Sequence, residues 1–495
     1  MSETAGSSQA GGAPGLLERM RWLGWVALLA AVALYAHRQG QRALAEMHGN
    51  DFKHIYLGTV LLRHGENPYD GESFLRRANQ YGFRAVNPYV YPPTTGLALR
   101  RLTWRTPQEA ARIWFFCNHA MVLAALVLCV HFFLGWRDPW RLALIALLAA
   151  TSFPLRRTLT AGQLNCVLLL LYCGVYWGLK ARRDWFAGLL VGFGILFKLA
   201  PGIFVLYFLW KRRWQALGWT AIGFAAILLL SIAAVGWRVH ADYWPVVRAM
   251  GYGRSVWEEV LVAGEQEPFY RDPFNQSFNS LFHHLLAPDP LGRMKPWIDL
   301  EGARFRVFGF ELPVSGLKLA NGLTILAAVS LLILALWAVG WRGTIVAPAD
   351  RQGQTAGKMP VPPTGETRRL GLEVALTAML GLLLPSIMWD HYLVLLFFPQ
   401  IVLLSNLLEK GRWGIWRVGA LLCASVLVAV PVAFWPVAFG QREFSEGLGL
   451  LSMSVGLYGV LILFGLAVHT VLEQRRAFAV TRAGQPPGEQ AEFLG

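Results

Sequence analysis

The sequence predicts an all-helical, polytopic membrane protein, and composition and the recurrence of long apolar runs are the observations behind this. Of the 495 residues, 55% are hydrophobic and only 15% are charged, whereas a soluble chain carries about a quarter charged residues. Apolar runs recur from residue 22 to residue 473, and about 20 apolar residues cross the hydrocarbon core as a helix. We therefore expect the core to be the membrane-embedded bundle itself.

Twelve apolar segments are candidates for membrane helices, and the first is interpreted as an uncleaved helix because no clear signal-peptide cleavage site follows it. They are 20–37, 110–134, 140–153, 163–180, 184–197, 199–211, 215–236, 316–341, 370–388, 391–408, 415–436 and 447–472.

The segment 184–211 decides whether the number of crossings is odd or even. Basic clusters flank it at both ends, and both look cytoplasmic by the positive-inside rule. A lysine, Lys198, and a helix breaker, Pro201, interrupt the apolar run. Two short helices that meet near Lys198 would return both clusters to one side, with irregular backbone that is buried or lines a cavity.

The positive-inside rule then predicts the topology. The N-terminal tail 1–19, the Pro- and Gly-containing linker 342–369 and a polar, disordered tail 474–495 are expected in the cytoplasm. The two long loops 38–109 and 237–315 are expected outside, where they carry interfacial helices, and segment 20–473 is the membrane-embedded domain.

The net charge of +15 does not indicate a nucleic-acid partner, because no basic domain stands apart from the membrane. Short basic clusters between apolar runs are typical of topology signals and of contacts with membrane lipids. All five cysteines lie inside apolar segments and form no CxxC pair, so no zinc site is expected. No Gly-rich phosphate loop and no metal-ligand cluster is present either, so we predict no cofactor and no metal.

The first outer loop carries the first candidate for chemistry. Apolar or neutral residues recur at helical spacing after Asp51, which predicts a helix lying in the interface with one face down. Asp51 falls at the start of this helix, where it is either an N-cap or a general base held ionised at the membrane surface. His54 follows one turn later, and Tyr91 belongs to an aromatic turn that would anchor at the interface or form the wall of a substrate site.

Further polar candidates lie at helix junctions predicted to face outward. Arg156 and Arg157 are suited to bind a phosphate, whereas Gln163 and Asn165 open an apolar helix and would bind either substrate or a neighbouring helix. Lys198 lies in an apolar run, where an ionisable group indicates function unless the side chain reaches to the surface.

The last candidates lie late in the chain. Asn275 is part of a polar run that ends the second outer loop. Asp390 and His391 are the acidic and imidazole groups between two apolar runs, and they form either a polar turn or a site at which His391 steers a phosphate or acts as a base.

Taken in order, these pieces resemble glycosyltransferase family 87, polytopic enzymes of the GT-C architecture that include polyprenyl-phosphate-mannose-dependent α-mannosyltransferases. The pieces that carry the resemblance are Asp51-Phe52 with Tyr56, Asn67-Pro68-Tyr69, Tyr91-Pro92-Pro93, Gly162-Gln163-Leu164-Asn165, Lys198-Leu199-Ala200-Pro201, Asn275-Gln276-Ser277 and Trp389-Asp390-His391.

The resemblance implies a GT-C-like bundle of about twelve helices, a site at the outer leaflet and an inverting displacement. It assigns the family's essential acid to Asp51 and a histidine near the site to His391. The chain departs from the family pattern at Leu199, where a proline often follows the lysine, and at Tyr392, where a second histidine often stands. These departures bear on the substrate.

The sequence thus predicts a multi-pass enzyme of the cell membrane, such as a bacterial inner membrane. It would move a sugar, with mannose the first expectation and arabinofuranose the next, from a polyprenyl-phosphate carrier to a lipid or glycan acceptor. Phosphate departure needs cations and the acceptor hydroxyl needs a base. The alternatives are a flippase or transporter of lipid-linked glycans, which internal repeats would favour, and an assembly subunit without catalysis.

Overall fold

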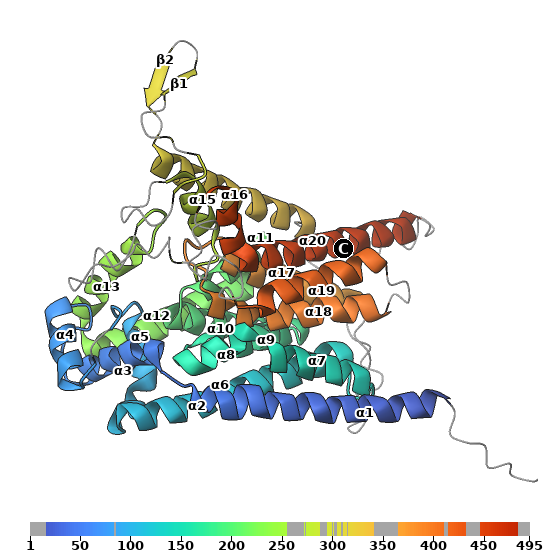
Figure 1. The fold of residues 1–495 in the computed structure, drawn as a ribbon, viewed down its shortest axis with the longest axis horizontal. Helices are drawn as coiled ribbons and strands as arrows, with labels where there is room; N and C mark the ends of the chain where they lie inside the picture. Colours follow the sequence, from blue (N-terminus) through green and yellow to red (C-terminus); the bar gives the residue numbers. More distant parts are fainter. Residues whose placement is uncertain are drawn as a thin grey trace, which may run out of the picture.

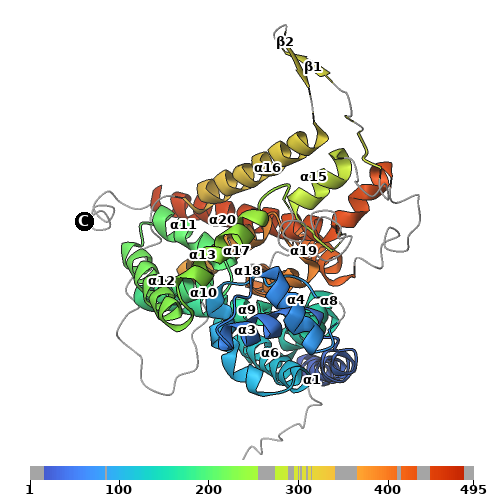
Figure 2. The same cartoon turned by 90° about the vertical axis from the view of Figure 1, so that its left-hand side faces the viewer.

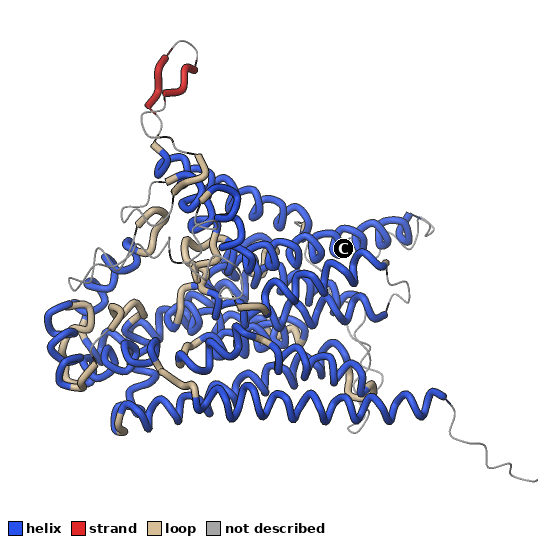
Figure 3. Tube along the Cα trace, viewed as in Figure 1, coloured by secondary structure: helices blue, strands red, loops and turns tan. Residues whose placement is uncertain are grey.

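The chain folds into a bundle of packed helices with one small β-hairpin (Figures 1 and 3). The structure is a computed structural model that describes residues 16–83, 86–254, 272, 274–287, 295–298, 300, 304–307, 310–313, 315–340, 365–409, 414–431 and 446–483. The predicted linker 342–369 lies mostly outside these ranges, as do most of the N-terminal tail and residues 484–495.

The first half of the chain forms the following helices: α1 (Leu16–Tyr35), which continues through a π-helical turn η1 (Ala36–Arg42) into α2 (Ala43–Ala45), then α3 (Asn50–Arg63), α4 (Gly71–Gln80), α5 (Pro93–Leu99), the 3-10 turn η2 (Arg100–Trp104), α6 (Pro107–Cys129) with its π-helical end η3 (Val130–Leu134), α7 (Pro139–Thr151), α8 (Phe153–Ala161), α9 (Asn165–Lys180), α10 (Asp184–Phe197), η4 (Ala200–Gly202), α11 (Ile203–Trp210) and α12 (Trp214–Val235).

The second half continues with α13 (Trp237–Ala249), α15 (Phe278–Leu286), strands β1 (Arg304–Val307) and β2 (Phe310–Pro313), α16 (Gly316–Val339), α17 (Gly365–Leu383), the 3-10 helix η6 (Asp390–Leu396), α18 (Phe397–Glu409), α19 (Ile415–Ala429), the 3-10 helix η10 (Gly447–Ser454) and α20 (Val455–Ala483).

Each of the twelve predicted segments contains a helix, but fewer helices satisfy the length of a membrane crossing. Within the described ranges, six helices are long and apolar enough to cross, or seven if the bent pair α7 and α8 forms one span. Helices α9, α10 and α19 are apolar but shorter. A multi-pass membrane protein is therefore supported, while the number of twelve crossings stays a prediction.

The predicted break at Lys198 is confirmed. Helix α10 ends at Phe197, Lys198 is extended, and α11 follows after a short 3-10 turn. The side chains of Asp184, which opens α10, and Arg213, which follows α11, form an ion pair of 2.7 Å. The two helices therefore return to the same end of the bundle, as the positions of the basic clusters predicted.

Helix α10 packs closely on α12 through small residues. A Cβ atom placed on Gly192 would lie 2.7 Å from both the backbone nitrogen of Phe224 and the carbonyl oxygen of Thr220. Gly188 lies one turn earlier and meets the backbone of Ala216 in the same way. Glycines four residues apart allow two helix backbones to approach within a membrane, where packing replaces the hydrophobic effect as the cause of association.

A buried ion pair ties α11 to α17 at the end of the bundle that carries the basic clusters. Lys211 Nζ lies 3.1 Å from Glu373 Oε1, and both side chains are almost fully buried. The hydroxyl of Tyr207 donates to Glu373 at 3.0 Å, and Arg369 Nε lies 3.3 Å from the same carboxylate. A buried charge needs such partners, because desolvation would otherwise be too costly.

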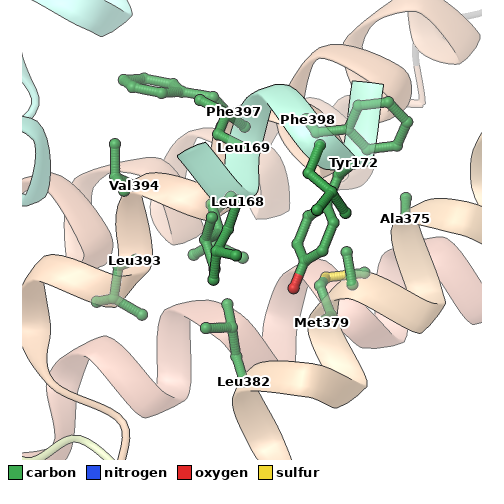
Figure 4. Close-up of a cluster of buried hydrophobic side chains, with 14 of the residues drawn as sticks. Leu168, Leu169, Tyr172, Ala375, Met379, Leu382, Leu393, Val394, Phe397 and Phe398 are labelled. Carbon is green, nitrogen blue, oxygen red and sulfur yellow. The ribbon is translucent and has the colours of Figure 1, made fainter. Parts of the chain in front are cut away.

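The core between α9, α17 and α18 is apolar (Figure 4). Leu168, Leu169 and Tyr172 on α9 face Ala375, Met379 and Leu382 on α17 and Phe398 on α18, and all are buried. Leu393 and Val394 of η6 join the same cluster. This packing fixes η6, whose first residues are the predicted pair Asp390 and His391, to the centre of the bundle.

The short helices α3, α4, α5 and α13 gather at one end of the bundle (Figures 1 and 2). The expectation that the helix after Asp51 rests on the interface by one face is wrong. Helix α3 is buried on nearly all sides from Phe52 to Leu62, because it packs within the protein against α4, α5, α6 and α8.

Three further boundaries differ from the prediction. The first helix continues to Ala45 rather than ending at residue 37. Strands β1 and β2 form an antiparallel hairpin in the second outer loop, which the all-helical prediction did not include. Helix α20 continues through Ala483, so residues 474–483 of the predicted disordered tail are helical.

Candidate active site

A polar cavity of about 200 Å³ lies at the end of the bundle where α3, α4, α5 and α13 gather. Its wall is built from the start of α3, the extended segment before α5, the end of α8 and the segment that leads into η6. The lining residues are Asp51, His54, Asn87, Pro88, Val90, Tyr91, Arg157, Gln163, Met250, Asp272, Phe274, Ile387, Trp389, His391 and Tyr392. We call this space the polar cavity.

Asp51 lies in the first turn of α3, but it is not the N-cap. Gly49 occupies that position with a positive φ of 57°, and no side chain caps the helix. The carboxylate of Asp51 instead takes a hydrogen bond from the amide of Gln163. The hydroxyl of Tyr91 donates to Gln163 Oε1 at 3.2 Å, so the amide is held with its nitrogen toward Asp51.

Gly162 allows this arrangement. It ends α8 with φ of 76°, and a Cβ atom there would lie 2.6 Å from the Cβ of Phe52. The carbonyl of Gln163 accepts hydrogen bonds from Trp114 and Asn118 on α6 at 3.2 and 3.0 Å. A larger residue at Gly162 would thus separate α3 from the segment that orients Asp51.

The electrostatics of the cavity keep Asp51 ionised. Burial acts to raise the pKa of Asp51, but the imidazoles of His391 and His54, the hydrogen bond from Gln163 and the charge of Arg157 outweigh it, so the pKa lies below its usual value. Burial lowers the pKa of His54, against the opposing attraction of Asp51. A carboxylate with a neutral imidazole beside it is therefore available at neutral pH.

The segment that leads into η6 is held by Asn275 and Gln276, which lie in the predicted outer loop 237–315. Asn275 and Trp389 form an antiparallel bridge, and Asn275 Oδ1 accepts from the backbone nitrogen of Met388 at 3.0 Å. The side chain of Gln276 bridges to the start of α20, donating to the carbonyl of Met453 at 2.7 Å and accepting from the nitrogen of Gly456 at 2.8 Å. Hydrogen bonds between the side chains of Asn275 and Gln276 and distant backbone groups, rather than local sequence, therefore fix the position of His391.

His391 is buried, and neither of its ring nitrogens has a hydrogen-bond partner among the described residues. Its Nδ1 lies 3.3 Å from Asp390 Oδ1, and the other oxygen of Asp390 lies 3.4 Å from Arg157 Nε. The Arg157 guanidinium also stacks over the ring of Phe274 at 4.8 Å. These contacts orient a cation and an imidazole toward the polar cavity.

A second, larger cavity of about 540 Å³ adjoins the polar cavity and shares Val90, Tyr91, Met250, Ile387 and Tyr392 with it. We call it the apolar cavity. Its remaining wall is mostly apolar and comes from α9, α11, α13 and α17; it includes Leu168, Leu199, Ile203, Leu206, Tyr243, Val247, Leu380, Leu382, Leu384 and Leu395.

Lys198 is the cation of the apolar cavity. Its Nζ donates to Asn165 Oδ1 at 2.8 Å and lies 3.7 Å from the ring centre of Tyr392. Asn165 in turn donates to the carbonyl of His391 at 3.1 Å. The two cavities are therefore linked by a chain of contacts from Lys198 through Asn165 to His391.

The structure brings most of the predicted site residues together. Asp51, His54, Tyr91, Arg157, Gln163 and His391 line the polar cavity, and Asn165 and Lys198 line the apolar one. Asp390 lies behind His391. Arg156 points elsewhere and pairs with Glu46, while Asn275 supports the segment into η6, so neither lines a cavity.

Several lining residues were not predicted, including Asn87, Asp272 and Phe274 in the polar cavity and Tyr243 in the apolar one. They come from segments without regular pattern or from an outer helix whose apolar face looks like an interfacial anchor. Within the ranges that the structure describes, no three His, Cys, Asp or Glu side chains form a group able to hold a metal ion.

This arrangement places a buried carboxylate, an arginine and a lysine around two adjoining cavities, one polar and one mostly apolar. The model of glycosyltransferase family 87 matches residues 89–354, more than half of the chain. The chain belongs to glycosyltransferase family 87 and is a glycosyltransferase. The matched region includes Tyr91, Gln163 and Lys198, whereas Asp51 and His391 lie before and after it.

Individual relatives are mycobacterial enzymes. The chain is 27% identical to a polyprenol-phosphate-mannose-dependent alpha-(1-2)-phosphatidylinositol pentamannoside mannosyltransferase of Mycolicibacterium smegmatis, over 72% of this chain and 70% of that protein. It is 28% identical to a polyprenol-phosphate-mannose-dependent alpha-(1-2)-phosphatidylinositol mannoside mannosyltransferase of Mycobacterium tuberculosis, over 32% of this chain and 39% of that protein. An alpha-(1->3)-arabinofuranosyltransferase of Mycobacterium tuberculosis is 29% identical over 42% of this chain and 46% of its own length.

Proposed function

We propose that this glycosyltransferase moves a sugar, with mannose the first choice, from a polyprenyl-phosphate carrier to a lipid-linked or cell-envelope glycan at the outer face of the membrane. The observation that carries the proposal is the junction of the two cavities. A small polar space that holds a carboxylate adjoins a larger apolar space that holds a lysine, and both are lined by Tyr91 and Tyr392. A polyprenyl-phosphate sugar has matching parts in the same order: a polar sugar, an anionic phosphate and an apolar prenyl chain.

The donor phosphate is assigned to Lys198. An ammonium group beside an amide and an aromatic ring can make charge-assisted hydrogen bonds to phosphate oxygens in a site of low dielectric constant. Arg157 assists from the polar side, where its pairing with Asp390 is loose at 3.4 Å. Arg156 is no longer part of this proposal, because it pairs with Glu46 away from both cavities.

The reaction is a single displacement, as the family resemblance implies. Asp51 accepts the proton of the acceptor hydroxyl while the hydroxyl oxygen forms a bond to the anomeric carbon of the donor sugar. The bond between that carbon and the phosphate oxygen breaks, and its electron pair leaves with the polyprenyl phosphate. Lys198 stabilises the charge that develops on the leaving phosphate, and His391 is oriented to contact the reacting groups.

The names of the relatives support mannose as the sugar and a phosphatidylinositol mannoside as an acceptor class. Arabinofuranose is the second candidate, because another relative transfers it. The function is tested with purified protein in lipid nanodiscs, a panel of polyprenyl-phosphate sugars and a membrane lipid extract as the acceptor pool. A new glycolipid from one donor is expected, and the absence of product from every donor would overturn the proposal.

A flippase or transporter of lipid-linked glycans is the second class. It predicts movement of an unmodified donor between leaflets, whereas the transferase predicts consumption of the donor and release of polyprenyl phosphate. The polar side chains that line the polar cavity gather near one end of the bundle, which favours the transferase. Donor that crosses vesicle membranes intact, with no new glycolipid, would support the transporter instead.

The orientation of the site is tested by topology. Single cysteines are introduced at Glu265 and Thr355 in a variant that lacks the five native cysteines. We expect an impermeant thiol reagent to label position 265 but not position 355 in intact cells, because the positive-inside rule predicts the first outside and the second in the cytoplasm. The reverse pattern would be incompatible with a site at the outer face.

A further inference from the structure

A groove between α5, α10 and α12 is separate from both cavities described above. It has a volume of about 370 Å³ and is lined by Thr94, Leu97, Ala98, Arg100, Phe193, Leu196, Phe197, Ile227, Leu230, Ser231 and Ala234. Its apolar part lies between the last turn of α10 and the last two turns of α12. From Ile227 to Ala234 the wall follows about 10 Å of helix, which suits part of an acyl chain.

Arg100 gives the groove a charged end. No carboxylate pairs with its exposed guanidinium within the described part of the chain. Arg100 opens the 3-10 turn η2, which also carries Arg101 and Trp104, the latter with 68% of its surface exposed. Exposed arginines next to an exposed tryptophan are typical of segments that lie at the level of anionic lipid headgroups.

The groove and the apolar cavity lie on opposite faces of a shared wall. Thr94 donates its hydroxyl proton to the carbonyl of Leu196, and Thr95 donates to the carbonyl of Phe197 at 2.7 Å. These bonds fasten the start of α5 to the end of α10, directly before Lys198. Tyr91 and Pro92 face the apolar cavity, whereas Thr94 and Arg100 face the groove. Two lipids could therefore occupy the two sites together.

We propose that the groove binds an anionic glycerophospholipid, with its phosphate on Arg100 and one acyl chain between α10 and α12. Charge complementarity selects this occupant. In a zwitterionic lipid, the cation of the headgroup competes with the Arg100 guanidinium for the same phosphate. The hydroxyl of Ser231, which contacts His240 Nε2 at 2.9 Å, adds a polar group to the lining. The binding is independent of the transfer reaction proposed above, so it is tested without turnover.

The test uses the full chain in phosphatidylethanolamine nanodiscs that contain a small fraction of phosphatidylglycerol with a diazirine in its acyl chain. Matched nanodiscs contain the same probe as phosphatidylcholine. After irradiation, mass spectrometry locates the labelled peptides, and labelling of the lipid-facing residue Leu326 on α16 serves as the reference. We expect phosphatidylglycerol, but not phosphatidylcholine, to label residues 193–197 and 227–234 above this reference.

Two pairs of variants make the result specific. Arg100→Gln should lower groove labelling by phosphatidylglycerol about fivefold, since a basic residue near a membrane surface contributes about 1 kcal/mol. Arg101→Gln, in the same turn but outside the groove lining, should leave the labelling unchanged. Ala234→Trp should abolish it by filling the groove, whereas Ala233→Trp on the neighbouring exposed position should not.

Equal labelling by the two lipids would overturn the proposal, and so would labelling that survives Ala234→Trp. An equal loss in Arg100→Gln and Arg101→Gln would also overturn it, because it would reflect the general surface charge. Arg100 and Ala234 are both exposed, so these substitutions leave the packed core intact. Since no outcome depends on transferase activity, failure of the groove and failure of the proposed reaction can be told apart.

Discussion

The most direct test of the site is the conversion of Asp51 to asparagine. The substitution preserves the shape of the side chain and removes its ability to take a proton. The amide nitrogen of Gln163 can still donate a hydrogen bond to the side-chain oxygen of the new asparagine, although the charge of the carboxylate is lost. A hydrogen bond to a charged group is roughly twice as strong as a neutral one, so we expect a loss of about 1 kcal/mol in stability.

The effect on turnover should be much larger. A positioned base contributes about 10²–10⁴-fold to rate, which corresponds to about 2.7–5.4 kcal/mol of transition-state stabilisation. The N-cap explanation no longer competes, because Gly49 holds that position. The expected result is therefore a folded variant that binds donor and transfers sugar at least about 100-fold more slowly.

The assay follows radiolabelled sugar from polyprenyl phosphate into lipid products, with purified protein in nanodiscs. Donor affinity is measured separately by competition, and folding by the melting temperature. The matched control is Asp70→Asn. Asp70 is the N-cap of α4 and accepts from the backbone nitrogen of Ser73, and asparagine caps about as well as aspartate.

Asp70→Asn should therefore retain normal turnover. If Asp51→Asn keeps more than about a tenth of the wild-type rate, the general-base role of Asp51 is wrong. His54, which lies one turn further along α3 in the same cavity, and His391 would then be the next candidates.

Three further predictions concern the donor phosphate, the ionisation of the base and the buried ion pair. Lys198→Met should weaken donor binding or turnover about 10- to 100-fold, because a hydrogen bond to a charged group contributes about 1.5–3 kcal/mol; unchanged kinetics would exclude Lys198 from the phosphate site. The pKa of Asp51 lies below its usual value of 3.8, so the transfer rate should fall only below pH 3.8. Gln163→Leu should shift this fall in the pH–rate profile to higher pH. A profile that does not shift would show that Gln163 does not lower the pKa of the carboxylate. Glu373→Gln should lower the free energy of unfolding by about 3–5 kcal/mol by removing the carboxylate that forms the buried ion pair with Lys211. The double substitution Lys211→Met with Glu373→Leu should restore most of the melting temperature, and equal losses in both proteins would contradict this account.

The sequence predicted those features of the fold that depend on local composition. The break at Lys198 followed from a charge and a proline inside an apolar run, and the position of Asp51 at the start of a helix followed from helical spacing. The burial of α3 could not be predicted, because a helix with one apolar face fits both a membrane interface and a protein interior. Only the contacts with α5 and α8 decide between them.

Neighbouring residues of like chemistry were equally hard to separate. Arg156 and Arg157 are adjacent on α8 and point in different directions, so spacing could not reveal that Arg157 alone lines the polar cavity. Asn275 looked like a ligand for substrate because it is polar and lies in an outer loop. Its actual partner, the backbone near Trp389, is more than 100 residues away in the chain and is brought close by tertiary structure.

The bridge from Gln276 to the start of α20 has a consequence for biosynthesis. The bridge holds the segment before η6 against a helix that begins only at Val455, while the proposed base, Asp51, lies near the start of the chain. A ribosome must therefore synthesise the chain through α20, and the insertion machinery must admit that helix, before the polar cavity acquires its final shape. Chains that lack α20 would therefore lack the arrangement of side chains that is proposed for catalysis.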